Sequence, residues 1–492
     1  MKSRFLFYIA LACALTIILG QYFSSYLIFS YDYIPLGWDT AIHMSKAISI
    51  KQDFLTTLFA EDFINILYLL LLSPFANDRY ILYLYETIIP PIILVLLIYV
   101  YCEFKGLQTS LGRIICCLAF PTYLIVYRYL ADLHPALLGT MLSMLTVNEL
   151  IKNISQGEVI KHKSKIMALI TLSSMTHIET ADFYLLSLFG SLLLIGKKRL
   201  FLKSLQLFSP LIVMNSLYIY HLSKLWGLAA EGYVQETPLL NIIGLLIAIT
   251  SLTVFCIFLK KKTLNHLKIE YSWLLALGLL TSLIYFMSIK FVRFYPYLER
   301  AILTFPLPIM IGIIAEKLVA KILNGKMRML IIVVVVLGLL YGGVAVAEHS
   351  TIHLRTWISK DAYYSIINAK SYDQHTITVF LYYDEDIYAG GLATMYDAWV
   401  TILYGKHYAY LGTLDNLLNG KETEFQSLFS KEVSKKFFFK LLENSIINKI
   451  KQCNENVNIV IINSFYKNFS KLYCDISEDS ICIIKLFNVC HK

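Results

Sequence analysis

The residues best suited to chemistry in this chain are acids and histidines that follow apolar runs. Asp39 and His43 come soon after the first such run and are four residues apart, so in a helix they share a face. An acid at this position is suited to act as a catalytic base or as a metal ligand. The structural alternative is that Asp39 or Thr40 caps a short amphipathic helix expected from Ala41 to Leu58.

A second polar turn contains Asp132 and His134, with Arg128 one helical turn earlier. Pro135 disfavours the α region at His134, and an extended segment would place Asp132 and His134 on one side. Two carboxylates, counting Asp39, and one imidazole suit Mg²⁺ or Mn²⁺, and the imidazole favours Mn²⁺. We therefore predict that Asp39, Asp132 and His134 form the catalytic site and bind a divalent metal. The alternative is that Asp132 caps a helix while His134 packs at the membrane interface.

Later turns supply residues suited to substrate binding. His177 and Glu179 lie where one apolar run turns into the next, and Arg293 and Arg300 flank an aromatic, proline-containing turn. The planar guanidinium group binds two phosphate oxygens at once, so these arginines are suited to a phosphate. A helix cap is the alternative for the His–Glu turn, and snorkelling to lipid headgroups is the alternative for the arginines. The predicted substrate-binding residues are His43, Arg128, His177, Glu179, Arg293 and Arg300.

Membrane-spanning helices must position these residues, because the composition is that of a membrane protein. Of the 492 residues, 57% are hydrophobic and only 16% are charged, and apolar runs of roughly 17 to 25 residues recur. The net charge of +9 follows short Lys/Arg loops rather than a basic stripe, so we expect no nucleic-acid partner. No P-loop, GxGxxG or GxSxG motif is present, so nucleotide-driven or hydrolase-elbow chemistry has no support.

The apolar runs predict eleven transmembrane helices. They cover about residues 5–30, 80–102, 112–129, 134–151, 164–177, 179–196, 200–221, 239–260, 271–290, 300–318 and 328–347. The apolar segment Phe63–Phe75 is too short to cross a bilayer, so we expect it to be re-entrant or to lie on the surface. This topology places 20 Lys and Arg residues inside and 8 outside before the C-terminal region. The positive-inside rule thus favours a multi-pass protein with a cytoplasmic N-terminus and an extracytoplasmic C-terminus.

The composition changes near residue 348, where apolar runs shorten to strand length. Thr376–Tyr383, Val457–Ile462 and Ile481–Phe487 are typical of buried strands, and Glu424–Lys451 is typical of a helix. We predict a transmembrane domain over residues 1–347 and a small extracytoplasmic α/β domain over residues 348–492. Four cysteines cluster near the C-terminus without a CxxC pair, which favours disulfides over a zinc site. These cysteines are Cys453, Cys474, Cys482 and Cys490.

The order of these features resembles the GT-C superfamily of membrane glycosyltransferases over about residues 1–347. The shared pattern is a first span, an outer loop with an early acid, a short apolar segment, a second outer turn with an acid, and an extracytoplasmic C-terminal domain. Asp39 matches the first-loop Asp, and the Asp132-to-His134 segment resembles the DxH motif with which archaeal oligosaccharyltransferases bind a divalent metal. Arg293 and Arg300 stand where members often place a basic residue for the donor phosphate. The WWDYG motif of oligosaccharyltransferases is absent.

The resemblance implies an all-α polytopic membrane enzyme that transfers a sugar from a polyprenyl-phosphate or polyprenyl-diphosphate lipid, of the dolichol type, on the outer face. The acceptor would be a glycan or a protein, the cofactor Mg²⁺ or Mn²⁺, and the surroundings membrane lipids. A metal-independent enzyme with Asp39 as the base stays open. So do a transporter or channel lined by the polar residues, and a non-catalytic protein whose outer domain binds a partner. Polar residues at outer turns and the lack of an inverted repeat disfavour the transporter.

Overall fold

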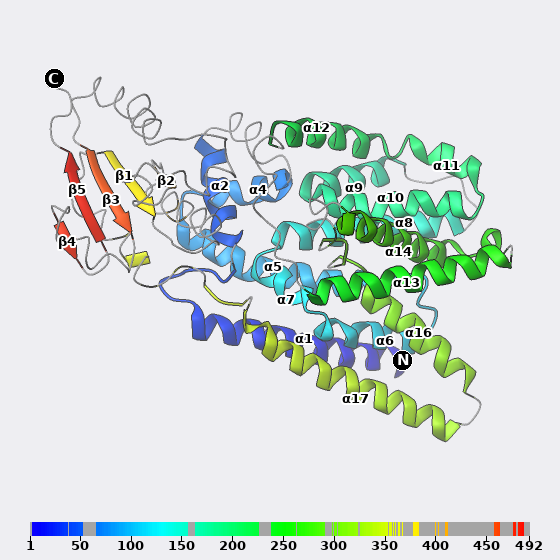
Figure 1. Cartoon of the computed structure of the whole chain (residues 1–492). Coiled ribbons are helices and arrows are strands. Elements are labelled where there is room, and N and C mark those ends of the chain that lie inside the picture. Colours follow the sequence, from blue (N-terminus) through cyan, green and yellow to red (C-terminus); the bar gives the residue numbers. More distant parts are fainter. Residues whose placement is uncertain are drawn as a thin grey trace.

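The computed structural model describes most of the first 352 residues and a sheet in the C-terminal part of the chain. The described residues are 2–37, 39–52, 65–155, 163–225, 238–261, 263–290, 300–302, 304–322 and 325–352, isolated positions at 298 and from 354 to 402, and the five strands. Up to residue 352 these ranges are mainly helical (Figure 1).

The described helices, in chain order, are α1 (Lys2–Phe29), α2 (Asp39–Gln52), α4 (Ile66–Leu72), α5 (Arg79–Cys102), α6 (Ser110–Ala119), α7 (Ile125–Ala131), α8 (His134–Ser155), α9 (Lys163–Thr176), α10 (Ile178–Leu194), α11 (Lys198–Leu205), α12 (Ser209–Leu225), α13 (Pro238–Lys260), α14 (Ile269–Lys290), α16 (Leu307–Lys321) and α17 (Gly325–His349). Short 3-10 helices lie at η2 (Ser73–Phe75), η3 (Phe120–Thr122), η4 (Leu264–His266) and η6 (Ser350–Ile352).

Apolar side chains from neighbouring helices form one extended core. α14 packs against α13 and α10, α8 packs against α9 and α5, and α1 contacts both α6 and α17. Figure 1 shows α1 and α17 running side by side. In the core, Trp273 of α14 is fully buried, and its indole N–H donates to the Tyr184 carbonyl of α10 at 3.1 Å. This hydrogen bond satisfies the polar group of a large buried side chain and joins the two helices.

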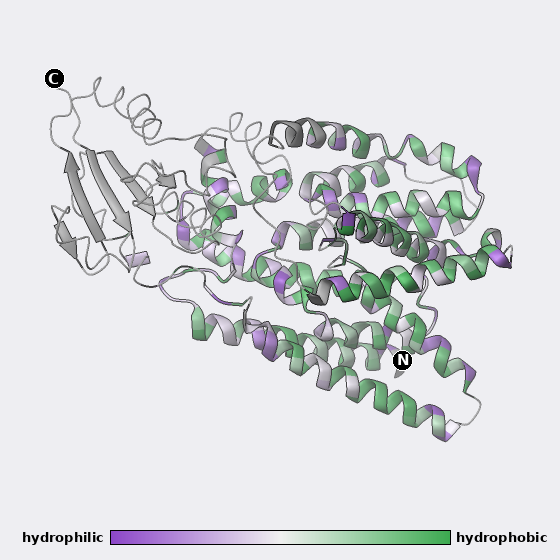
Figure 2. Cartoon of the chain, viewed as in Figure 1, coloured by the Kyte–Doolittle hydropathy of each residue, from purple (hydrophilic) through white to green (hydrophobic). Residues whose placement is uncertain are grey.

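Five described helices are long and apolar enough to cross a membrane. They are α1 from Arg4, α5, α13 from Asn241, α14 and α17, and a bent pair over residues 110–131 raises the number to six if it is one span. Apolar side chains of α13 and α17 are largely exposed, and Figure 2 shows apolar residues along both helices with polar residues at their ends. Such uncovered apolar surface suits lipid better than water. The structure is therefore compatible with an integral membrane protein.

Helices overlap all eleven predicted spans, but three of these spans are broken. In the span predicted at 300–318, residues 304–306 leave the helix before α16 begins at Leu307. Pro121 lies in the 3-10 turn after α6, and the chain bends by 64° before α7. Pro210 stands at the second position of α12, which separates this helix from α11. The short apolar segment forms α4 and η2 over Ile66–Phe75, which agrees with the prediction that it is too short to span. The long apolar helices of the described ranges number five or six, so the count of eleven spans stays a prediction.

Five strands form one mixed sheet in the order β2-β1-β3-β5-β4. They are β1 (Ile377–Tyr382), β2 (Ala409–Leu411), β3 (Val457–Ile462), β4 (Ile476–Glu478) and β5 (Ile481–Leu486). β1 pairs in parallel with β2 and β3, whereas β5 pairs antiparallel with β3 and β4. The three predicted strands coincide with β1, β3 and β5 to within one residue at either end.

Other predictions for the C-terminal part fall outside the described residues. The helix predicted over Glu424–Lys451 lies between β2 and β3, where the parallel order of β1 and β3 requires a long connection. Cys482 lies in β5, but Cys453, Cys474 and Cys490 belong to ranges that the structure does not describe. A disulfide among them and a separate extracytoplasmic α/β domain therefore stay predictions.

Candidate functional site

Gly37 joins the first polar segment to the second. Its φ is +93°, and a Cβ at this position would lie 1.8 Å from the carbonyl oxygen of Ala131. Glycine alone combines this left-handed φ with so close an approach of two backbones. The hydroxyl of Thr40 lies 2.8 Å from the carbonyl oxygens of both Leu36 and Ala131, which strengthens the junction. The start of α2 is thereby held against the end of α7, so the two predicted acidic segments touch.

Asp39, the first residue of α2, is partly buried near basic side chains. Burial raises the pKa of its carboxyl above the ordinary value, while Arg128, Lys46 and Arg300 oppose this rise. Burial disfavours the charged form of an acid, and nearby cations favour it. A carboxylate whose conjugate acid has a raised pKa holds an abstracted proton better near neutral pH, so this shift is in the direction that a general base requires.

Asp132 is the C-cap of α7, and its backbone there is not extended. Its amide donates to the Arg128 carbonyl at 3.0 Å, and its carboxylate Oδ1 lies 4.0 Å from Arg128 Nε. α8 begins at His134, with Pro135 at its second position, where the missing N–H of proline is not needed. The predicted extended segment from Asp132 to His134 is therefore wrong, because one residue closes a helix and the other opens the next.

Arg300 lies between two acids that are distant in sequence. It forms an ion pair with Glu179 in the first turn of α10, through Nη1 and Oε2. The other oxygen of Glu179 accepts a hydrogen bond from the Tyr218 hydroxyl at 2.7 Å. Arg300 also interacts electrostatically with Asp39. Glu179, predicted to bind substrate, thus holds Arg300 near Asp39.

His177 acts as the N-cap of α10. Its Nδ1 accepts a hydrogen bond from the Thr180 amide at 3.3 Å and lies 2.7 Å from the Thr180 hydroxyl. These contacts agree with the capping alternative for His177, since a capping side chain satisfies a free amide of the first helical turn. Its substrate-binding role stays a prediction. Arg293 lies outside the described residues, so its predicted role also stays a prediction.

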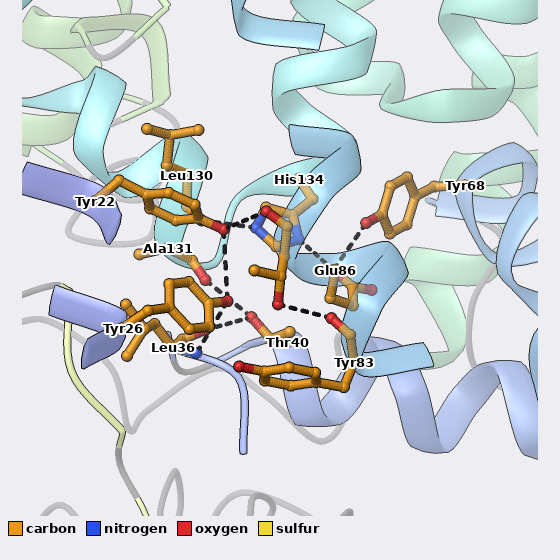
Figure 3. A network of polar contacts seen from close by, with 11 residues as sticks. Tyr22, Tyr26, Leu36, Thr40, Tyr68, Tyr83, Glu86, Leu130, Ala131 and His134 are labelled. Carbon is orange, nitrogen blue, oxygen red and sulfur yellow. Dashed lines mark hydrogen bonds and ion pairs between the residues drawn. The ribbon is translucent and has the colours of Figure 1, made fainter. Parts of the chain in front are cut away.

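Three helices contribute a buried cluster of ionisable side chains. His43 of α2, Glu86 of α5 and His134 of α8 each offer a ligand atom within 4.8 Å of the others, and they are 6%, 0% and 1% exposed. Figure 3 shows His134 and Tyr68 pointing toward Glu86. The Tyr68 hydroxyl donates to Glu86 Oε2 at 2.9 Å, and His134 Nδ1 contacts the same oxygen. Burial lowers the pKa of His43 well below its ordinary value, which keeps its imidazole neutral.

Two tyrosines of α1 tie these helices together. The Tyr22 hydroxyl donates to the Thr87 carbonyl of α5 at 3.0 Å, directly beside Glu86 in the chain. The Tyr26 hydroxyl accepts a hydrogen bond from the Leu36 amide at 3.4 Å, just before α2 begins (Figure 3). Both contacts fix α1 against the elements that carry the cluster.

The structure brings only part of the predicted metal set together. Asp39 and Asp132 lie on touching segments, but His134 meets Glu86 and His43, and no cluster of three ligands within the described ranges contains either aspartate. The shared-metal role of the two aspartates therefore stays a prediction. Sequence reasoning missed Glu86, although it is the only acid in the 24-residue apolar helix α5. An ionisable residue inside a membrane-type helix is itself a signal of function.

No family model matches the chain, and no curated protein matches it.

Proposed function

We propose that this chain is a GT-C-type membrane glycosyltransferase that moves a sugar from a polyprenyl-phosphate or polyprenyl-diphosphate lipid to a glycan or protein acceptor. The observation that carries the proposal is the gathering of one acid and two arginines from three distant chain segments. Asp39 follows the end of the first apolar helix, and its carboxyl interacts with Arg128 and Arg300. Such a site suits a donor whose apolar chain stays in the membrane while its phosphate lies at the surface.

Each of these groups has one role in the proposed transfer. Asp39 takes the proton of the acceptor as the acceptor atom attacks the anomeric carbon of the sugar. The bond between that carbon and the phosphate oxygen breaks, and negative charge develops on the leaving phosphate. Arg128 and Arg300 stabilise this charge, because guanidinium groups bind phosphate oxygens in pairs. Glu179 positions Arg300 through their ion pair. No step depends on a metal at Asp39 and Asp132.

The proposal uses the predicted topology of eleven spans, a cytoplasmic N-terminus and an extracytoplasmic C-terminal domain. The distribution of basic residues supports it. α13 ends at Lys260, and α17 begins with Gly325, Lys326 and Met327 followed by Arg328. Figure 1 shows these two helix ends on the same side of the molecule as the N-terminus, whereas Asp39 follows the other end of α1. Basic ends on one side and the acid–arginine site on the other agree with an outer active site.

Mass spectrometry of lipid-linked sugars in cells with and without the gene tests this function. We expect a polyprenyl-linked sugar to accumulate when the gene is deleted and to return to its ordinary level with the wild-type chain. Asp39→Asn keeps the size of the side chain and removes its charge, so the fold should survive. The transfer rate of this variant should fall by about two orders of magnitude or more, the contribution of a positioned acid–base group.

Asp32→Asn is the matched control, because Asp32 is a carboxylate of the same loop outside the proposed site. Its Oδ2 accepts a hydrogen bond from the Tyr363 hydroxyl at 2.7 Å and lies 3.8 Å from Arg79. Its φ of 43° lies in the left-handed region, which asparagine tolerates. This variant should restore sugar transfer. Identical lipid-linked sugars in cells with and without the gene would contradict the glycosyltransferase proposal and favour a transporter or a binding protein.

A further inference from the structure

A carboxylate buried in an apolar helix needs a cation. Glu86 is fully buried in α5, one of the helices apolar enough to span a membrane. A charge in such surroundings is costly unless it is paired. Glu86 Oε2 contacts the Tyr68 hydroxyl and His134, but Oε1 has no hydrogen-bond partner among the residues that the structure describes. These contacts leave the carboxylate incompletely satisfied.

His134 is oriented as a metal-binding histidine is. Its Nε2 lies 3.0 Å from the Leu130 carbonyl oxygen, which only accepts hydrogen bonds, so the hydrogen-bond network assigns the proton to Nε2. In the neutral ring, Nδ1 then carries a lone pair, and this atom faces Glu86 Oε2 (Figure 3). Two lone pairs in contact repel unless a cation lies between them. Metal-bound histidines commonly donate their second N–H to a backbone carbonyl in this way.

The surroundings of His43 favour a metal ion over a proton shared by Glu86 and His134. It is buried, and within the described part of the chain its Nδ1 has no hydrogen-bond partner. It nevertheless offers a ligand atom within 4.8 Å of those of Glu86 and His134. A proton between Glu86 and His134 would leave His43 and Glu86 Oε1 unsatisfied. One divalent cation bound by all three side chains would satisfy the whole cluster.

We propose that His43, Glu86 and His134 bind one divalent transition-metal ion, with Zn²⁺ as the best match. Two imidazoles and one carboxylate are a common zinc set and leave a fourth position open. Mg²⁺ and Ca²⁺ instead prefer oxygen ligands throughout. Tyr68 supports the site from outside, since its hydroxyl donates to Glu86 Oε2 at 2.9 Å. The site shares only His134 with the set implied by the family resemblance, and it does not depend on the proposed glycosyltransferase function.

Metal binding by the full-length chain in detergent tests the site without any activity assay. The protein is stripped with EDTA, dialysed, titrated with Zn²⁺, and its metal content is measured by mass spectrometry. We expect one Zn²⁺ per wild-type chain. Glu86→Gln and His43→Gln should lose this stoichiometric zinc, and Tyr68→Phe should weaken binding by about 10- to 100-fold, as outer-shell changes do.

Control variants distinguish this site from a metal site at Asp39 and Asp132 and from a general effect of removing a buried carboxyl group. Glu316→Gln removes a second buried carboxyl of an apolar helix, one that accepts hydrogen bonds from the Thr109 amide and hydroxyl, and it should keep the zinc. Asp39→Asn and Asp132→Asn should also keep it. Loss of zinc in these two variants with retention in Glu86→Gln would overturn the proposal in favour of the aspartate set.

Cobalt loading of the wild-type chain keeps the test independent of how any variant folds. Co²⁺ bound by two imidazoles and a carboxylate with low coordination number should give intense visible d–d bands, and added Zn²⁺ should abolish them. A wild-type chain that takes up neither ion in stoichiometric amount would overturn the proposal and leave a proton shared by Glu86 and His134. That result would not affect the proposed sugar transfer, whose test reads lipid-linked sugars.

Discussion

Replacement of Gly37 by alanine should separate the two acidic segments, and its cost follows from the structure. The φ of +93° is costly for any residue with a Cβ, by about 1–2 kcal/mol. The new Cβ would also lie 1.8 Å from the Ala131 carbonyl oxygen and 2.4 Å from its carbon. Both are backbone atoms, so no rotamer change relieves the clash, and forced overpacking costs about 1–3 kcal/mol more. The free energy of unfolding should thus fall by about 2–5 kcal/mol.

Thermal unfolding of the full-length chain in detergent measures this effect. Gly37→Ala should lower the Tm by several degrees. The rate of sugar transfer should also fall at temperatures where the variant is still folded, because the start of α2 would shift from α7 and move Asp39 relative to Arg128. Gly20→Ala is the matched control. A Cβ at Gly20 in α1 would meet nothing within 4 Å, and alanine favours helix over glycine by about 1 kcal/mol, so its Tm should stay or rise. A wild-type Tm for Gly37→Ala would refute the close junction.

Three further predictions concern the base, the topology and the cysteines. Burial raises the pKa of Asp39, and the positive charge of Arg128 opposes this rise. Arg128→Gln should therefore raise the pKa of Asp39 further and move the acidic limb of the pH–rate profile for sugar transfer to higher pH. An acidic limb that stays at the wild-type pH would contradict Asp39 as the base. An impermeant thiol reagent should label Lys421→Cys but not Gly157→Cys in intact cells, and the reverse pattern would exclude an outer active site. Mass spectrometry of unreduced peptides should find a disulfide among the four C-terminal cysteines, where closing a loop of the 453-to-490 size stabilises by roughly 3–4 kcal/mol; four free thiols would rule it out.

Helix and strand positions were accessible from the sequence, because they depend on local runs of residue types. The predicted strand Val457–Ile462 coincides with β3, and α13 lies within two residues of the run predicted at 239–260. In the segment Phe63–Phe75 the described helix covers only Ile66–Phe75, which agrees with the prediction that it is too short to cross. Local breaks were harder to foresee. The chain bends by 64° between Thr122 and Ile125, just after Pro121, although the apolar run continues past this point.

Some residues of the candidate site could be recognised from the sequence, whereas their spatial partners could not. The residue types of Asp39, Arg128 and His134 mark them from the sequence, because charges beside apolar runs are rare and conspicuous. Their partners do not follow from spacing. The prediction of an extended segment from Asp132 to His134 was wrong, since Asp132 is the C-cap of α7 and His134 is the first residue of α8.

Amino-acid order thus decides where the chain is helical, which helices suit a membrane and which polar residues stand at their ends, since each of these is a property of a short stretch. The meeting of His43, Glu86 and His134 depends on how α2, α5 and α8 pack, and these residues are 43 and 48 positions apart along the chain. The approach of Gly37 to Ala131 likewise joins segments that no local pattern relates. Tertiary packing selected these partners, because the side chains that meet at a buried polar group are those that the neighbouring helices present.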